Sequence, residues 1–259
     1  MAIWQLQGTT PVNQNNLGQN PGPTWHVEAA KDFDGNGVAD ILFQNDNGAL
    51  ALWELQNTAA GPQILNQFNI GQNPGPTWHA VAAGNFNGDG RAGILFFNDD
   101  GLHAAIWEMN PNGPAIGPNG VFTQQVNLPS TGSSTWKPVA VADFNGDGKD
   151  DIVWQNTNGT VAIWEMTGDG AGSTTAVKPN GQFNIDGTQF VGPTWHVVAA
   201  RDFNNDGKAG LLWQNDSGAI ALWENFTEGP LGSVHASFTV QQNITPQPNP
   251  PGVHEWHIV

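Results

Sequence analysis

Cysteine is absent from this sequence, which excludes a disulfide framework, a thiol nucleophile and a thiolate metal site. Lysine and arginine number only 7 against 23 aspartates and glutamates, so the net charge is −16. Nucleic acids and anionic membranes bind clustered basic side chains, and we expect neither as a partner. No apolar run approaches the ~18 residues of a membrane helix, so we also expect no membrane insertion.

The sequence does contain a unit of roughly 55 residues that recurs along the chain and holds all twelve tryptophans. A repeat of this period indicates a solenoid, a propeller or an array. The tryptophans mark three segments of the unit: Trp25, Trp78, Trp136, Trp195 and Trp256 begin the first, Trp154 and Trp213 lie in the second, and Trp4, Trp53, Trp107, Trp164 and Trp223 lie in the third. Phe43 and Phe96 replace tryptophan in two copies of the second segment.

Each full unit predicts four short antiparallel strands. An acidic loop follows the first strand, and a tight Asn/Asp/Gly turn, typical of a hairpin, joins the second strand to the third. Four such strands per repeat are typical of a propeller blade. We therefore predict an all-β fold, a β-propeller of four-stranded antiparallel blades. It forms a single domain over residues 1–259, with complete repeats at about 25–77, 78–135, 136–194 and 195–254.

The two ends of the chain leave one blade incomplete. Residues 2–18 supply a third and a fourth strand, and residues 255–259 supply a first strand. Joined together, they would close a five-bladed ring whose last blade lacks its loop and its second strand. The alternatives are a fragment of a longer array, or loose strands that pair with a second subunit in a homo-oligomer, because unpaired edges invite such pairing.

The acidic loops span residues 32–40, 85–93, 143–151 and 202–210, one in each full repeat. Calcium takes about 6–8 oxygen ligands, and alternate loop positions can supply them as side chains, one carbonyl and a last carboxylate. The ligands predicted in this way are Asp32, Asp34, Asn36, Val38 and Asp40; Asn85, Asn87, Asp89 and Arg91; Asp143, Asn145, Asp147, Lys149 and Asp151; and Asp202, Asn204, Asp206 and Lys208. Gly93 and Gly210 replace the last carboxylate. We expect the first and third loops to bind calcium most readily, then the fourth, and the second least.

These loops, with an apolar strand after each, resemble the FG-GAP/VCBS repeats of integrin α-chain propellers, bacterial surface proteins and a fungal propeller lectin. The resemblance covers essentially the whole chain. It implies a β-propeller with a calcium ion in each intact loop, in a structural role. It does not settle function, because the family includes adhesins, lectins and appendages of enzymes.

Two further periodic features accompany the loops. A histidine follows the first-strand tryptophan at His26, His79, His196 and His257, with Lys137 in the remaining copy. Since the first strand is innermost in a propeller, we expect these side chains at one mouth of the channel as polar rim residues; a metal or anion site is the alternative. A glutamate follows the third-strand tryptophan at Glu54, Glu108, Glu165 and Glu224, and this periodicity favours a scaffold role.

No catalytic motif is present, so we expect a binding protein and not an enzyme. The leading prediction is a calcium-stabilised module, secreted or at the cell surface although no signal peptide begins the chain, with a glycan or another cell-surface ligand as its partner. We interpret most tryptophans as core and expect a sugar site near the loops between blades. The alternative is a structural or protein-interaction array that self-associates through its incomplete blade. A third reading is a glycan-active enzyme with its acids in the variable loops.

Overall fold

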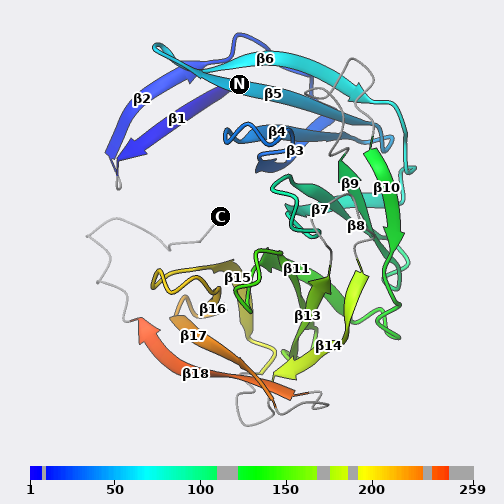
Figure 1. Ribbon diagram of the computed structural model, residues 1–259, viewed down its shortest axis with the longest axis vertical. Coiled ribbons are helices and arrows are strands. Elements are labelled where there is room, and N and C mark those ends of the chain that lie inside the picture. Colours follow the sequence, from blue (N-terminus) through cyan, green and yellow to red (C-terminus); the bar gives the residue numbers. More distant parts are fainter. Residues whose placement is uncertain (8–9, 110–121, 168–175, 186–191, 230–234, 245–259) are drawn as a thin grey trace.

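The computed structural model describes residues 1–7, 10–109, 122–167, 176–185, 192–229 and 235–244 (Figure 1). Every regular element in these ranges is a β-strand. Within them no helix is long and apolar enough to cross a membrane.

Strands β3 to β18 form four antiparallel blades of four strands each, taken in chain order. The first blade holds β3 (Trp25–Lys31), β4 (Asp40–Asn45), β5 (Leu50–Thr58) and β6 (Gly61–Ile70). The second holds β7 (Trp78–Gly84), β8 (Gly93–Asn98), β9 (Ala104–Met109) and β10 (Phe122–Asn127). The third holds β11 (Trp136–Ala142), β12 (Asp151–Asn156), β13 (Val161–Thr167) and β14 (Ala176–Ile185). The fourth holds β15 (Trp195–Arg201), β16 (Gly210–Asn215), β17 (Ile220–Glu228) and β18 (His235–Ile244).

The blades are arranged around a common centre, as Figure 1 shows. Each blade turns its first strand inward, and β3 contacts β7, β7 contacts β11, and β11 contacts β15. The fourth strands lie at the periphery, where β14 and β18 pair in parallel and join the last two blades. The predicted all-β propeller with four complete repeats is therefore confirmed.

A separate two-stranded sheet precedes the first blade. It consists of β1 (Ala2–Gln7) and β2 (Thr10–Asn16), and β2 contacts β6. Ile3 and Leu17 pack against the cluster that contains Phe43 and Trp53. These strands correspond to the expected third and fourth strands of a closing blade. Residues 255–259, predicted to add its first strand, lie outside the described residues, so closure with five blades stays a prediction.

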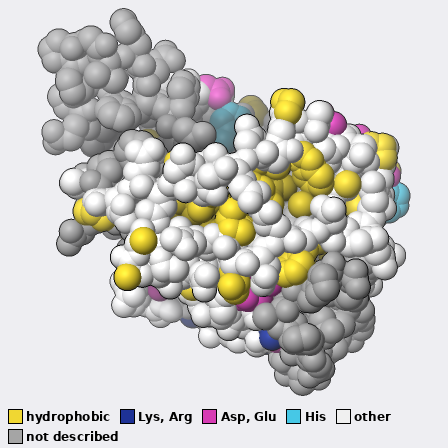
Figure 2. All heavy atoms as spheres, turned by 90° about the horizontal axis from the view of Figure 1, so that it is seen from above, with side chains coloured by type: hydrophobic (Ala, Val, Ile, Leu, Met, Phe, Trp, Pro, Cys, Tyr) yellow, Lys and Arg dark blue, Asp and Glu magenta, His cyan; other side chains and the backbone are white. Residues whose placement is uncertain are grey.

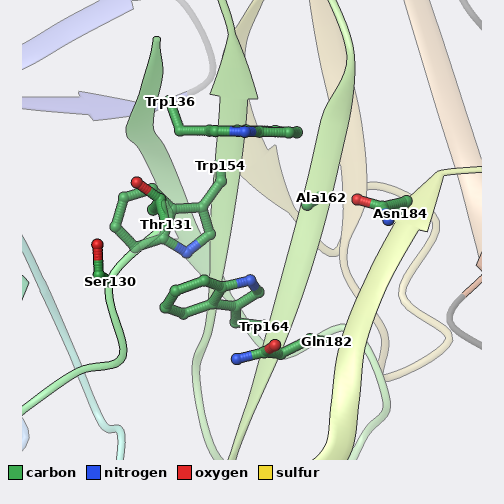
Figure 3. Close-up of a pocket in the computed structure, with 8 residues that line it drawn as sticks. All are labelled: Ser130, Thr131, Trp136, Trp154, Ala162, Trp164, Gln182 and Asn184. Atoms are coloured by element: carbon green, nitrogen blue, oxygen red, sulfur yellow. The ribbon is translucent and has the colours of Figure 1, made fainter. Parts of the chain in front are cut away.

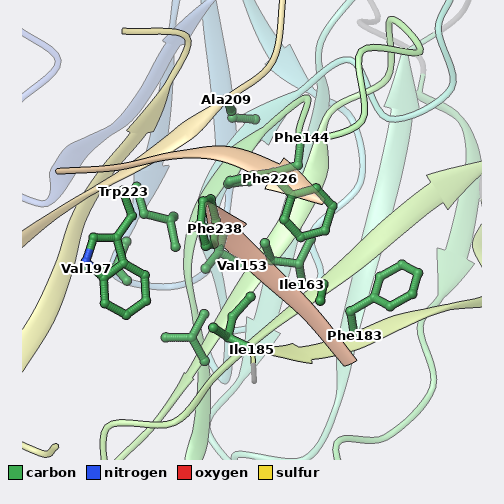
Figure 4. Close-up of a cluster of buried hydrophobic side chains, with 14 of the residues drawn as sticks. Phe144, Val153, Ile163, Phe183, Ile185, Val197, Ala209, Trp223, Phe226 and Phe238 are labelled. Atoms are coloured by element: carbon green, nitrogen blue, oxygen red, sulfur yellow. The ribbon is translucent and has the colours of Figure 1, made fainter. Parts of the chain in front are cut away.

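The hydrophobic core lies between neighbouring blades. Each blade presents one aromatic couple from its second and third strands, with ring centroids 4.7–4.8 Å apart: Phe43–Trp53, Phe96–Trp107, Trp154–Trp164 and Trp213–Trp223. Tilted pairs at this spacing add about 0.5–1.5 kcal/mol beyond the area they bury. Figure 4 shows the cluster of buried hydrophobic side chains between the third and fourth blades. In it, Val153 and Ile163 of the third blade face Trp223 and Phe238 of the fourth. The first-strand tryptophans among the described residues are only half-buried: Trp25, Trp78, Trp136 and Trp195.

On the face of the described residues that Figure 2 shows, uncharged polar side chains and backbone cover most of the surface. On the face in Figure 2, hydrophobic side chains gather in a band, and charged side chains are few. Among the described residues, the large exposed hydrophobic side chains come from different strands and loops: Met1, Val12, Val27, Leu65, Val81, Phe203 and Ile244. Isolated apolar side chains are normal at protein surfaces and do not by themselves mark a docking site.

Candidate functional site

The first acidic loop folds around the carboxylate of Asp32. Its Oδ1 accepts the backbone N–H groups of Gly35 and Asn36, at 2.7 and 3.2 Å, and its Oδ2 accepts the N–H of Gly37 at 2.7 Å. Gly35 and Gly37 have φ values of 79° and 82°, which side chains other than glycine rarely adopt. The glycines of the repeat are therefore what allow the loop to close on its first aspartate.

Asp40 ends this loop inside the protein, with none of its surface exposed. Its carboxylate accepts the N–H of Phe33 at 3.0 Å and that of Leu55 at 2.9 Å. Burial nevertheless raises the pKa of Asp40 to about 7, and the nearby carboxylate of Asp34 adds to the rise. Oxygens of Asp32, Asp34 and Asp40 lie within 4.8 Å of one another. The loop thus gathers three acidic side chains whose charges need a cation or protons.

The third loop repeats this geometry. Asp143 accepts the N–H groups of the fourth, fifth and sixth loop positions at 2.7, 3.2 and 2.8 Å. Asp151 is fully buried and accepts the N–H of Phe144 at 3.0 Å and that of Met166 at 2.9 Å. Burial raises the pKa of Asp151 to about 8, and the carboxylates of Glu165 and Asp143 contribute.

The second and fourth loops keep the turn and lack the buried aspartate. In the second loop, Asn85 Oδ1 accepts the N–H groups of Gly88 and Gly90 at 3.0 and 3.3 Å. In the fourth loop, Asp202 accepts from the fifth and sixth positions at 3.2 and 2.9 Å. The ninth positions, Gly93 and Gly210, offer no side-chain ligand.

The donors of the first and third loops fit a hard cation such as calcium. Both loops provide carboxylate, amide and carbonyl oxygens on one turn, the ligand chemistry that calcium prefers. Behind them, Oε1 of Glu54 and Oε1 of Glu165 are buried without a hydrogen-bond partner. Buried acidic groups left in this way are costly unless a cation or protons compensate them. Among the described residues, the acidic side chains of the first loop are the ones close enough together to form a group of three that could hold a metal ion.

Neighbouring loops are linked by backbone hydrogen bonds. The N–H at the eighth position of each loop donates to the carbonyl at the first position of the preceding loop. The three bonds are Ala92 to Asp32 at 2.8 Å, Asp150 to Asn85 at 2.8 Å, and Ala209 to Asp143 at 2.7 Å. The four loops therefore form one continuous arc at the same end of the propeller.

Three first-strand histidines contact the hairpin turns of the first, second and fourth blades. Each pairs with an aspartate of its own blade's hairpin turn: His26 with Asp46 at 2.7 Å, His79 with Asp99 at 2.8 Å, and His196 with Asp216 at 2.7 Å. Both partners are more than half exposed in every pair. Among the described residues these histidines belong to no group of three or more side chains that could hold a metal ion.

A pocket of about 320 Å³ opens on the third blade (Figure 3). Its walls come from all four strands and from the segment before β11: Ser130, Thr131, Trp136, Trp154, Ala162, Trp164, Gln182 and Asn184. The indole rings of Trp136, Trp154 and Trp164 lie one above another, and the amides of Gln182 and Asn184 flank them.

One indole in this pocket has an unsatisfied donor. Trp154 is 1% exposed, and its Nε1 has no hydrogen-bond partner among the described residues. Trp213, at the same place in the fourth blade, has the same unsatisfied Nε1. In the first two blades Phe43 and Phe96 occupy this position and carry no such donor. A buried N–H without a partner calls for a ligand or a water molecule.

The sequence interpretation missed this pocket because it assigned the tryptophans to packing. One recurring signal does mark it: the fourth strand carries Gln-x-Asn opposite the third-strand Ala-x-Trp in every blade. The pairs are Gln67 and Asn69, Gln125 and Asn127, Gln182 and Asn184, and Gln241 and Asn243. Ligand pockets combine aromatic and apolar walls with a few polar groups that orient the ligand, and the third blade places these amides beside its indoles.

Comparisons with known proteins bear on the whole chain. The model of the FG-GAP-like repeat matches residues 32–96, 86–154 and 143–213. No curated protein matches. Among solved structures, the chain is similar to the Photorhabdus luminescens Tc holotoxin pore, with 13% sequence identity and a TM-score of 0.33 over 99% of this chain. The chain spans 13% of the length of that protein chain.

Proposed function

Because this chain belongs to the FG-GAP-like repeat family, we propose that it is a calcium-stabilised binding module whose ligand is a carbohydrate, in a lectin or adhesin role outside the cell. FG-GAP-like repeats build binding modules of many kinds, so the ligand must be argued from the site and not from the fold. The observation that carries the proposal is the pocket of the third blade.

This pocket has the chemistry that a sugar ring needs. A pyranose has an apolar face, which stacks on indole rings, and a rim of hydroxyls, which bond to amides. Trp136 and Trp164 supply aromatic surface, and Gln182 and Asn184 supply amide groups. The unsatisfied N–H of Trp154 is buried under this aromatic surface, and a small shift of the ring would let it donate to a hydroxyl or ring oxygen. Its volume of about 320 Å³ suits a ligand the size of one sugar unit.

In this proposal calcium has a structural role. An ion held by the acidic loops would neutralise the buried carboxylates and fix the turns that connect the first and second strands. Because such an ion binds the folded state, it would stabilise the fold by mass action. The backbone hydrogen bonds between neighbouring loops would pass this rigidity from blade to blade.

Self-association is a second candidate function, favoured by one observation. Strands β1 and β2 pair with each other and with no other described strand. Sheet edges of this kind can pair with a second chain. Light scattering over a range of protein concentrations distinguishes the two: mass that rises with concentration, without sugar binding, favours the interaction array.

The proposal is tested with a glycan array in calcium, followed by calorimetry with the best-bound glycan. Trp154→Phe removes the indole N–H and keeps an aromatic ring, as in the first two blades. We expect about tenfold weaker binding from the lost hydrogen bond. Trp107→Phe is the matched control, because the Nε1 of Trp107 already bonds to Gln125 at 3.2 Å. Absence of any glycan binding, or equal binding by both variants, would contradict the proposal. Cleavage of the bound glycan would instead indicate an enzyme.

A further inference from the structure

The glutamate after the third-strand tryptophan is buried in three of the four blades. Glu54, Glu108 and Glu165 are 0%, 3% and 0% exposed. Each lies directly across the sheet from the ninth position of its own loop, because Ile41 pairs with Trp53, Ile94 with Trp107 and Ile152 with Trp164. Cross-strand neighbours point to the same face of a sheet. The side chain of the glutamate and the side chain at the ninth position therefore point into the same space.

In the first and third blades an aspartate fills that space, and the glutamate turns elsewhere. Asp40 takes the two backbone N–H groups, while Glu54 Oε2 accepts the side-chain N–H of Asn66 at 2.8 Å. In the third blade, Glu165 Oε2 bonds to the ammonium of Lys178 at 2.5 Å. These glutamates lie beside complete loops without replacing any member of them.

In the second blade the ninth position is Gly93, which has no side chain. The carboxylate of Glu108 lies in the space that this leaves. A Cβ atom on Gly93 would lie 2.7 Å from Oε2 of Glu108 and 3.2 Å from its Cδ. The carboxylate of Glu108 thus occupies the place where an aspartate side chain would begin. Glutamate is one methylene longer than aspartate, which lets it reach this place from the neighbouring strand.

We propose that Glu108 supplies the missing carboxylate of the second loop and completes a calcium site with Asn85, Asn87, Asp89 and the carbonyl of Arg91. The inference rests on the calcium binding proposed above. It gives the second loop two carboxylates, as many as the fourth loop has in Asp202 and Asp206 and one fewer than the first and third loops have. The fourth loop gains nothing equivalent, because the atom of Glu224 near Gly210 is Cγ, 3.2 Å from a Cβ built there.

The test needs a readout for each loop separately. The sixth position is glycine in all four loops: Gly37, Gly90, Gly148 and Gly207. Its N–H donates to the first-position side chain, at 3.3 Å for Gly90 and Asn85, so metal binding to that side chain changes its amide chemical shift. Calcium is titrated into protein labelled with ¹⁵N-glycine, and the four amide signals are followed by NMR.

In the wild-type protein we expect the Gly90 signal to respond together with those of Gly37 and Gly148. In Glu108→Gln, the Gly90 response should need at least about tenfold more calcium, because one charged ligand is lost. The Gly37 and Gly148 signals should titrate as before and show that the variant is folded. Asp99→Asn removes one charge from the exposed hairpin turn of the same blade; it is the control and should leave the Gly90 response unchanged.

A reciprocal exchange keeps the test independent of the folding of one variant. Gly93→Asp with Glu108→Ala places the carboxylate at the ninth position, where the first blade has Asp40, and should restore the Gly90 response. The new Cβ would lie 3.0 Å from the carbonyl oxygen of Trp107, which must shift by a few tenths of an ångström. The calcium binding proposed above is contradicted if the Gly37 and Gly148 amide signals do not respond to calcium in the wild-type protein. The assignment of Glu108 is overturned if they respond while Gly90 is silent in the wild-type protein, or titrates equally in wild type and Glu108→Gln.

Discussion

Gln44 on β4 holds the backbone of Ala80 in the next blade: the Ala80 N–H donates to Gln44 Oε1 at 2.8 Å. The Nε2 of the same side chain donates to the carbonyl of Trp78 at 2.7 Å. Gln155 makes the same two bonds between the third and fourth blades, with Val197 as the N–H donor at 3.1 Å. One glutamine side chain thus satisfies two inner-strand backbone groups that no strand pairing reaches.

Replacing Gln44 with leucine should destabilise the protein by about 1–3 kcal/mol, because two buried backbone groups lose their partner at nearly constant side-chain volume. Chemical denaturation measures the change. Gln56→Leu, at an exposed position of β5, is the control and should change the free energy of unfolding by less than about 0.5 kcal/mol. Equal effects of the two variants would show that the inter-blade bonds contribute nothing.

The second blade has no glutamine at this position, so it makes no such pair of hydrogen bonds to the third blade. Its equivalent residue is Phe97, which packs against Trp154 with centroids 5.9 Å apart. The residue of the third blade at the place of Ala80 is Pro138, which has no backbone N–H to offer. The sequence predicts blades and loops because their spacing recurs locally. It does not predict contacts between blades, because these join residues that share no local pattern.

A similar contact explains a glycine in the loops. Gly35 lies beneath the side chain of Arg91 from the next loop, and a Cβ there would be 3.2 Å from Arg91 Nε. Gly37 has a similar φ, and a Cβ on it would meet nothing within 4 Å. The fourth loop has Asn205 at the equivalent of Gly35, with φ of 62°. Among the described residues no further loop follows the fourth one, so no side chain covers Asn205 as Arg91 covers Gly35. Asparagine also tolerates a positive φ.

Gly35→Asn should therefore cost about 1 kcal/mol more stability than Gly37→Asn, measured by denaturation in EGTA. Both substitutions place asparagine at a positive φ, and only the first displaces Arg91. Adding Arg91→Ala should remove the difference between them. If the two glycine variants were equally stable with Arg91 present, the loops would not be packed on one another as the structure shows.

Calcium should raise the melting temperature of protein treated with EGTA. A site with calcium at one hundred times its dissociation constant stabilises the fold by about 2.7 kcal/mol. Asp34→Asn removes a charged ligand of the first loop and should reduce the calcium-dependent rise. Asp46→Asn, in an exposed hairpin turn, is the control and should leave it intact. A melting temperature that does not change with calcium would contradict the assignment of these loops.

The candidate site was predictable from the sequence only in part. The ligands within each loop follow from local spacing, so Asp32, Asp34 and Asp40 could be named together in advance. The pocket and the position of Glu108 could not, since each combines strands whose side chains meet only after the blade has formed. The second-strand tryptophans looked like core residues, and Trp154 is indeed buried; its unsatisfied N–H is visible only when every neighbour is placed.

The stability of the metal-free protein should fall as the pH rises from about 4 to about 8. Burial raises the pKa of Asp40 to about 7 and that of Asp151 to about 8, with backbone hydrogen bonds opposing both rises. In the unfolded chain both groups titrate near a pKa of about 3.9. Between these values the folded state keeps protons that the unfolded chain releases, so each added pH unit favours unfolding.

This dependence must be separated from general repulsion, since a chain with a net charge of −16 also repels itself more as its acids ionise. Melting curves are therefore recorded in EGTA with about 0.5 M salt, which screens exposed charges over a few ångströms and buried ones much less. We expect the decline between pH 5 and pH 8 to persist in salt and to become shallow with saturating calcium, because the ion compensates the ionised carboxylates. A melting temperature that rises over this range in EGTA would mean that the two aspartates are ionised and satisfied without a metal.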